Sequence, residues 1–297
     1  MIEKNIKEDF LELFYNDICD EKLENNNNLN LFTLKVKNNT FSYDELINEL
    51  GNKLYYFALS RKQINHLKKE DKLNDLIKKS KAKLKDYNTN DGELGEILLY
   101  CLLESHLNAP KILTKLELKT NSNDYVKGAD GVHILKLNES DYQLILGESK
   151  LNSDISSGIY EAFGSIDKFL KSSSKLELEI DLVNSELVKE SYDEESYNTL
   201  KKIMIPSAKE DKTYLDYSFG IFLGFDIQVS EEERKQSNSD FRKNIREKIK
   251  KQVLEAKASL NFQLKKKGYS GYQFYIYVVP FSDLKNVRKD IIKQIVE

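Results

Sequence analysis

The chain has 297 residues, of which 40% are hydrophobic and 32% are charged, a balance that indicates a folded globular protein and excludes a disordered or fibrous one. Its 46 Lys and Arg against 49 Asp and Glu give a net charge of −3, which argues against a histone-like DNA binder. Two cysteines, Cys19 and Cys101, are too few for a disulfide framework or a zinc cluster and indicate a reducing compartment. Because the N-terminus is charged and no apolar run approaches about 20 residues, we expect a cytoplasmic protein without a membrane partner.

Residues 1–87 are predicted to form a mostly helical N-terminal module. Ser42 and Glu45 match a capping box, in which a serine opens a helix and a glutamate three residues later closes the cap. In chain order we expect an alternating strand over 29–36, a helix over 42–69 and a lysine-rich helix to about 86. The polar cluster Tyr87–Asp91 is the expected boundary with a second unit, residues 88–297.

Residues 88–297 are predicted to be mixed α/β, with a core order of helix, three strands, helix and strand. In chain order we expect a helix over 92–107, strands over 112–119, 129–137 and 142–151, a helix over 156–170, an acidic helical stretch to about 200, a strand over 216–227, a basic helix over 230–267, a strand over 272–281 and a helix over 282–296. The short connection 138–141 makes the second and third of these strands a hairpin.

Three short segments carry acidic and basic side chains that could form a catalytic site. Glu96 lies in the first turns of the helix that begins near Gly92, Asp130 opens the second strand, and Glu148 and Lys150 close the third. Residues two apart in a strand point to the same face, so Glu148 and Lys150 are presented together. The hairpin brings the start of one strand beside the end of the other, so Asp130 is expected next to Glu148.

Paired carboxylates at one edge of a sheet favour a hard divalent cation, Mg²⁺ or Mn²⁺. A lysine beside them can orient and help deprotonate a water molecule, and this combination hydrolyses phosphodiesters. A helix carboxylate, Glu96 or Glu93, could complete the shell. The two glutamates share a helix face. We select Glu96, because Glu93 is equally explained by its favourable charge at a helix N-terminus.

These residues resemble the PD-(D/E)xK nuclease superfamily. The segments Gly-Glu-Leu-Gly-Glu, Lys-Gly-Ala-Asp-Gly-Val-His and Leu-Gly-Glu-Ser-Lys look more specifically like the HamA family, the nuclease effector subunits of the Hachiman anti-phage defence system. The resemblance covers residues 92–227, although Gly128-Ala129 stands where the superfamily motif has its proline. It implies a restriction-endonuclease-like core and metal-dependent DNA cleavage. Asp130 and Glu148 would be the metal ligands, and Glu96, Asp130, Glu148 and Lys150 the catalytic residues. It also implies a partner superfamily-2 helicase that restrains the nuclease until foreign or damaged DNA is engaged.

Two other functions stay open. The chain could be a catalytically silent adaptor that binds DNA or the helicase, although such a copy need not retain the Asp, the Glu and the Lys. It could also be a stand-alone restriction-type endonuclease, although the N-terminal module shows no helix-turn-helix or zinc signature.

Several other segments have competing interpretations. The basic stretches Arg61–Lys85 and Arg242–Lys267 could bind DNA phosphates or be solvated helix faces. The acidic stretch 177–195 could meet a basic partner or cover the DNA path. We interpret Glu117, in another Glu-x-Lys, as part of a solvated strand face, and His133 as a core or surface residue rather than a ligand.

Overall fold

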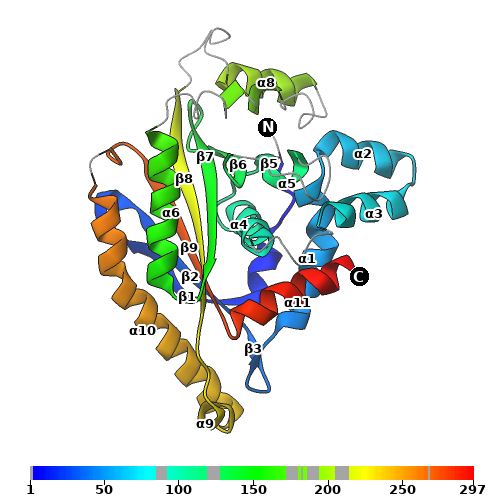
Figure 1. Cartoon of the computed structure of the whole chain (residues 1–297). Helices are drawn as coiled ribbons and strands as arrows, with labels where there is room; N and C mark the ends of the chain where they lie inside the picture. The colour runs from blue at the N-terminus through cyan, green and yellow to red at the C-terminus, as the bar shows by residue number, and fades with distance from the viewer. Residues whose placement is uncertain are drawn as a thin grey trace.

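The computed structural model describes residues 3–84, 92–118, 128–171, 180–181, 183–185, 194–204, 214–266 and 268–297. Helices pack on both faces of a sheet, which confirms the mixed α/β class (Figure 1). The strands are β1 (Phe14–Lys22), β2 (Asn28–Leu34), β3 (Val36–Lys37), β4 (Thr40–Phe41), β5 (Lys111–Thr114), β6 (Gly131–Lys136), β7 (Asp141–Asn152), β8 (Tyr214–Asp226) and β9 (Gln273–Phe281). The helices are α1 (Tyr43–Ala58), α2 (Arg61–Lys69), α3 (Leu73–Lys83), α4 (Glu93–Ser105), α5 (Lys115–Leu118), α6 (Ile155–Leu170), α8 (Glu194–Met204), α9 (Glu231–Arg234), α10 (Asn238–Leu264) and α11 (Leu284–Val296).

Within the described residues, seven strands form one sheet in the order β1-β2-β9-β8-β7-β6-β5. Strands β7, β8, β9 and β2 run parallel, whereas β5, β6 and β1 run antiparallel to their neighbours. In the central strand β8, Ser218 to Phe225 are all buried, as expected where helices cover both faces of a parallel region. Helix α6 contacts β7 and β8 on one face with α10 beside it, while α4 contacts the same strands on the other face together with α1 and α11 (Figure 1).

Two of the N-terminal strands, β1 and β2, belong to this same sheet, whereas β3 and β4 pair as a separate two-stranded sheet. β1 was not predicted from the sequence, and β2 pairs in parallel with β9, so that Asn28 lies opposite Tyr275. The helices of this region form as expected, but Ser60 divides the first of them by capping α2. The prediction of a capping box at Ser42 is wrong, because the Ser42 side chain makes no capping hydrogen bond. The proposed boundary at 87/88 lies outside the described residues and stays a prediction.

The segment predicted as one strand over 112–119 changes into a helix halfway. β5 ends at Thr114, whose hydroxyl donates to the Phe57 carbonyl at 2.8 Å and accepts the Glu117 amide at 3.2 Å. This side chain caps the short helix α5, so Lys115 is its first residue rather than part of the strand. The single helix predicted over 230–267 is likewise two helices, because the Ser237 side chain caps α10 separately. In the part of the chain that the structure describes, no helix is long and apolar enough to cross a membrane.

Candidate active site

Asp130 is fixed by backbone bonds on both sides just before β6 begins. Its amide donates to the Gly147 carbonyl of β7 at 2.9 Å, and its carbonyl accepts the Lys115 amide at 3.1 Å. Two residues earlier, Gly128 has a φ of +137°, a conformation that favours glycine and turns the chain into the sheet. The Asp130 carboxylate therefore lies where the start of β6 meets β7 and the start of α5.

The two oxygens of the Asp130 carboxylate have different environments. Oδ2 accepts hydrogen bonds from the Ser149 amide at 2.8 Å and from the Ser149 hydroxyl at 2.9 Å. Oδ1 faces the Lys115 ammonium at 3.3 Å. With the whole residue 8% exposed, this carboxylate is held in one orientation and presents Oδ1 to a cation.

Glu148 and Lys150 lie together on β7, as the alternation of the strand predicts. Lys150 Nζ is 2.5 Å from Glu148 Oε1, and both side chains are partly exposed. The antiparallel pairing of β6 with β7 reaches Val132 opposite Leu146, and the Asp130 amide bonds to Gly147 just beyond it. Asp130 therefore lies close enough for its charge to act on Glu148. Sequence reasoning therefore predicted this juxtaposition correctly.

The pKa values of this pair reflect the crowding of charge. Burial and the negative charge of Asp130 raise the pKa of Glu148 above its usual value of 4.5, against the opposing effect of Lys150. Burial lowers the pKa of Lys150, but the charges of Glu148 and Asp130 outweigh it, so the net pKa is raised. At neutral pH, Lys150 therefore stays protonated beside two carboxyl groups that repel one another.

Glu96, the predicted carboxylate of helix α4, is connected to Asp130 by Lys115, a residue that the sequence analysis did not select. Glu96 Oε1 lies 3.7 Å from Lys115 Nζ, the same ammonium that contacts Asp130. Glu93, the alternative, is 3% exposed at the start of the helix. Lys115 thus links Glu96 to Asp130, although the catalytic role of Glu96 stays a prediction.

Lys115 and Ser149 are the site residues absent from the sequence prediction. The signal for Ser149 was its place between Glu148 and Lys150 on β7, where its amide and hydroxyl both donate to Asp130. No comparable signal exists for Lys115, because its position depends on the change from strand to helix after Thr114.

Two other interpretations can be judged against the structure. His133 is buried, donates its Nδ1–H to the Ala109 carbonyl at 2.8 Å, and is a core residue rather than a ligand. The interpretation of Glu117 as a solvated residue is wrong. It lies in α5 with its side chain 6% exposed and pairs with the fully buried Lys111 at 2.9 Å, because a buried ammonium requires a counter-charge.

The donors present suit a hard divalent cation. Asp130 and Glu148 supply carboxylate oxygens, and their mutual repulsion is relieved by positive charge, which Lys115 and Lys150 supply in this structure. Among the described residues, no three or more His, Cys, Asp or Glu side chains form a set that could hold a metal ion. The fit therefore rests on the pair predicted from the sequence, Asp130 and Glu148.

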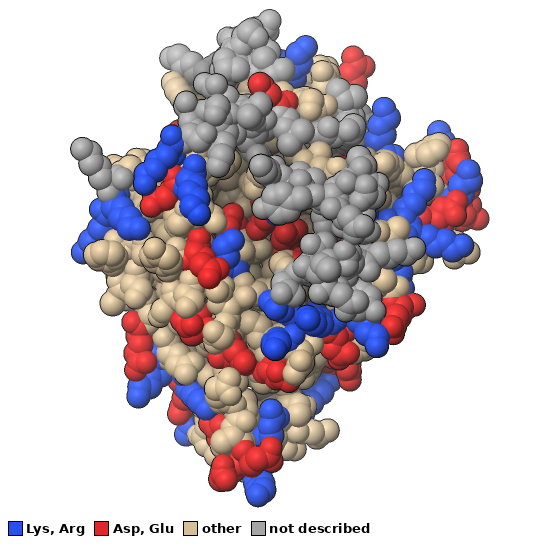
Figure 2. Space-filling view, viewed as in Figure 1, with Lys and Arg blue, Asp and Glu red and all other residues tan. Residues whose placement is uncertain are grey.

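The charged surface gives mixed support for a DNA path. Among the residues that the structure describes, Figure 2 shows Lys and Arg interspersed with Asp and Glu over the face in view, without a continuous basic field. Basic side chains of the second stretch pair with acids of other elements: Arg246 with Asp17, Lys248 with Glu233, Lys257 with Glu21, Lys265 with Glu24 and Lys266 with Asp167. Arg61 of the first stretch is buried, so it cannot meet phosphates as supposed. Most of the acidic stretch 177–195 lies outside the described residues.

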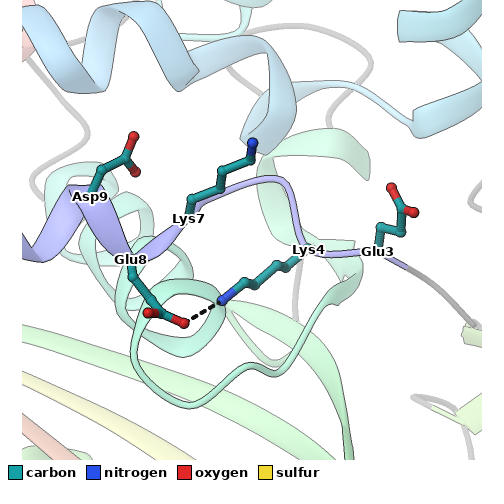
Figure 3. Close-up of a pocket in the computed structure, with 5 residues that line it drawn as sticks. All are labelled: Glu3, Lys4, Lys7, Glu8 and Asp9. Atoms are coloured by element: carbon teal, nitrogen blue, oxygen red, sulfur yellow. Dashed lines mark hydrogen bonds and ion pairs between the residues drawn. The ribbon is translucent and has the colours of Figure 1, made fainter.

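An open hollow at the N-terminal segment is unrelated to these residues. Its described lining is Glu3, Lys4, Lys7, Glu8 and Asp9, with Lys4 and Glu8 paired at 3.3 Å (Figure 3). Lys7 and Glu3 extend away from this pair, so the hollow presents mixed charges from one short segment rather than converging groups (Figure 3).

Fold and site together define an α/β protein with a carboxylate–lysine cluster at the edge of a mixed sheet. The sequence matches the HamA family over residues 8–295, nearly the whole chain, and the protein belongs to that family. This membership confirms the family resemblance and suggests a role in Hachiman anti-phage defence. No curated protein matches the chain significantly.

Proposed function

We propose that this protein is a divalent-metal-dependent DNA endonuclease or nickase that acts with a partner helicase as the effector of the Hachiman system. The observation that carries the proposal is the proximity of Asp130 to the Glu148–Lys150 pair, since two carboxylates and a lysine together suit metal-dependent phosphodiester hydrolysis. Strands β5 to β8 with α4 and α6 would form the PD-(D/E)xK core. Family membership supports the defence role.

Each residue has a defined part in this proposal. Asp130 and Glu148 would hold Mg²⁺ or Mn²⁺, and the bound ion would supply an activated water and neutralise charge on the phosphate. Ser149 keeps the Asp130 carboxylate oriented through two hydrogen bonds. Lys150, protonated and held by Glu148, orients the attacking water and stabilises negative charge on the scissile phosphate. Glu96 assists from α4.

The surface supports delivery of DNA by a partner. The net charge of −3 and the ion pairs along α10 leave little long-range attraction for a polyanion. A helicase subunit that binds DNA would provide that attraction and present a strand to the site.

The experiment is plasmid cleavage by the wild type and by the double variant Glu148→Ala/Lys150→Ala, in Mg²⁺, Mn²⁺ or EDTA, each with and without the helicase and ATP. We expect cutting that requires the metal and disappears in the double variant, with a circular dichroism spectrum that is unchanged. Cutting confined to reactions with the helicase would add the regulation.

The alternatives give different results in the same assay. A folded wild type that cuts neither DNA nor RNA under any condition would favour the silent adaptor. Full activity without the helicase would favour a stand-alone endonuclease.

A further inference from the structure

We propose that the Lys115 ammonium is a built-in counter-cation that occupies the place of the divalent ion and must be displaced before the ion binds. The isolated chain would therefore bind the metal ion weakly until the Lys115 side chain moves away from Asp130. This inference rests on the proposed function, because it concerns the ion that Asp130 and Glu148 would hold.

The position of the ammonium carries the argument. Lys115 Nζ lies 3.3 Å from Asp130 Oδ1 and 3.7 Å from Glu96 Oε1, so one positive charge bridges two carboxylates from different elements. Both carboxylate side chains are 10% exposed and the lysine side chain is 19% exposed. In such a poorly hydrated place, two carboxylates require a nearby cation.

The choice of oxygen makes lysine and metal competitors. Asp130 Oδ2 already accepts two hydrogen bonds from Ser149. Oδ1 is the oxygen that remains for a metal ion, and it is the oxygen that Lys115 contacts. An ion that binds Oδ1 must therefore take the place of the ammonium or push it aside.

The Lys115 backbone is held by hydrogen bonds, so its side chain can move away from Asp130 without disrupting β5 or α5. Its amide donates to the Asp130 carbonyl at 3.1 Å, and the Thr114 hydroxyl anchors the preceding residue to Phe57. The backbone is thus fixed, while the four-carbon stem can swing outward. Lys111, four residues earlier at the start of β5, differs because it is fully buried and its ammonium contacts the Tyr56 and Leu59 carbonyls and Glu117.

The experiment is titration of the full chain with Mn²⁺ by isothermal calorimetry, with the Mn²⁺-dependent rise in melting temperature as a second readout. Lys115→Met keeps the length of the side chain and removes its charge. We expect it to bind Mn²⁺ about tenfold more tightly than the wild type, because a competing charge a few ångströms from the ligands is gone. Adding Asp130→Asn to Lys115→Met should abolish the gain.

Two further variants keep the result interpretable. Lys53→Met is the matched control, since Lys53 is 25% exposed and pairs with Glu49 at 3.5 Å away from the site, and its affinity should equal that of the wild type. If Lys115→Met does not fold, Lys115→Gln, which is neutral but can still hydrogen-bond to both carboxylates, should show the same gain.

The outcomes separate this inference from the proposed function. Mn²⁺ binding that depends on Asp130 but is equal or weaker in the Lys115 variants overturns the counter-cation and leaves the metal site standing. No Asp130-dependent binding in the wild type or in either Lys115 variant overturns both.

Discussion

Helix α4 and the β5–α5 segment each contribute to two carboxylate–lysine clusters, and the two clusters differ in how their charges are satisfied. The inner cluster consists of Arg61, Glu104, Lys111 and Glu117. The edge cluster consists of Glu96, Lys115, Asp130, Glu148 and Lys150. The same pair of elements thus supplies both, with Glu96 and Glu104 on one helix and Lys111 and Lys115 on either side of the end of β5.

In the inner cluster, backbone groups satisfy the charges. Glu104 is fully buried and accepts the amides of Asn5, Ile6 and Lys111 at 2.6, 2.7 and 3.0 Å, with Arg61 Nη2 at 3.7 Å. These bonds join the N-terminal segment, α4 and β5. A carboxylate enclosed in this way stabilises the fold and offers nothing to a substrate.

In the edge cluster, charged side chains neutralise one another. Lys115 contacts Glu96 and Asp130, and Lys150 contacts Glu148, with all five side chains 10–24% exposed. Burial and the negative charge of Asp130 raise the pKa of Glu148. Like charges held close together with partial access to solvent are typical of functional sites. Side-chain composition alone therefore does not separate a structural ion cluster from the proposed active site, whereas the nature of the partners does.

The largest effect on stability is expected from the inner cluster. Glu104→Ala leaves three amides, two of them buried, without their acceptor and removes the carboxylate beside Arg61, so the free energy of unfolding should fall by about 3–5 kcal/mol. Urea denaturation measures this loss. Glu96→Ala, two turns away on the same helix, is the matched control and should cost about 1 kcal/mol or less, because its partner is partly exposed. Equal losses in the two variants would contradict the distinction between the clusters.

The buried imidazole beside the inner cluster should make stability depend on pH. Burial, together with the positive charges of Lys111 and Arg61, lowers the pKa of His133 from 6.5 to about 4, against the opposing effect of the Ala109 hydrogen bond. Since the folded state resists protonation, this contribution is complete above pH 6.5 and is lost as the pH falls toward 4. At about 1.4 kcal/mol per pH unit, the loss by pH 4 is about 3 kcal/mol.

The measurement is urea denaturation of the wild type and of His133→Gln between pH 7 and pH 4. The wild type should lose stability more steeply than the variant over this range. Parallel curves for the two proteins would show that His133 does not carry the effect.

The smallest effect concerns the support of the edge cluster. A Cβ at Gly95 of α4 would lie 3.3 Å from both Cβ and Oγ of Ser149, the residue that orients Asp130. Gly95→Ala should therefore shift Ser149, cost about 1 kcal/mol despite the better helix propensity, and reduce cleavage several-fold. Gly51→Ala in α1 meets no atom within 4 Å and should instead stabilise the protein by about 0.5–1 kcal/mol. Unchanged cleavage by Gly95→Ala would show that Ser149 does not position Asp130.

The predictable part of the site is the part that is local in sequence. Asp130, Glu148 and Lys150 lie on two strands joined by a short connection, so alternation and hairpin register suffice to bring them together. Lys115 depends on a hydrogen bond from Thr114 to Phe57, a residue 57 positions earlier, and no local pattern indicates that contact. For the same reason Glu117 was mistaken for a solvated residue.

The fold follows the same rule. Helices α4, α6 and α11 and strands β6 to β9 were predicted near their observed bounds, because their apolar periodicity is strong. β1 was missed, since its sequence Phe-Tyr-Asn-Asp-Ile-Cys-Asp-Glu-Lys is mostly polar, and two irregularities in its pairing with β2 interrupt the alternation. The pairing of β2 with β9 joins residues about 247 positions apart, which periodicity within a short window cannot reveal.

The central claim is that the edge cluster cleaves DNA and the inner cluster does not. The most direct test compares plasmid cleavage in Mg²⁺, with helicase and ATP present, by the wild type and by Asp130→Asn. We expect Asp130→Asn to lose activity by at least about 100-fold while its melting temperature stays within a few degrees of that of the wild type. Cleavage at the wild-type rate by a folded Asp130→Asn protein would contradict the account.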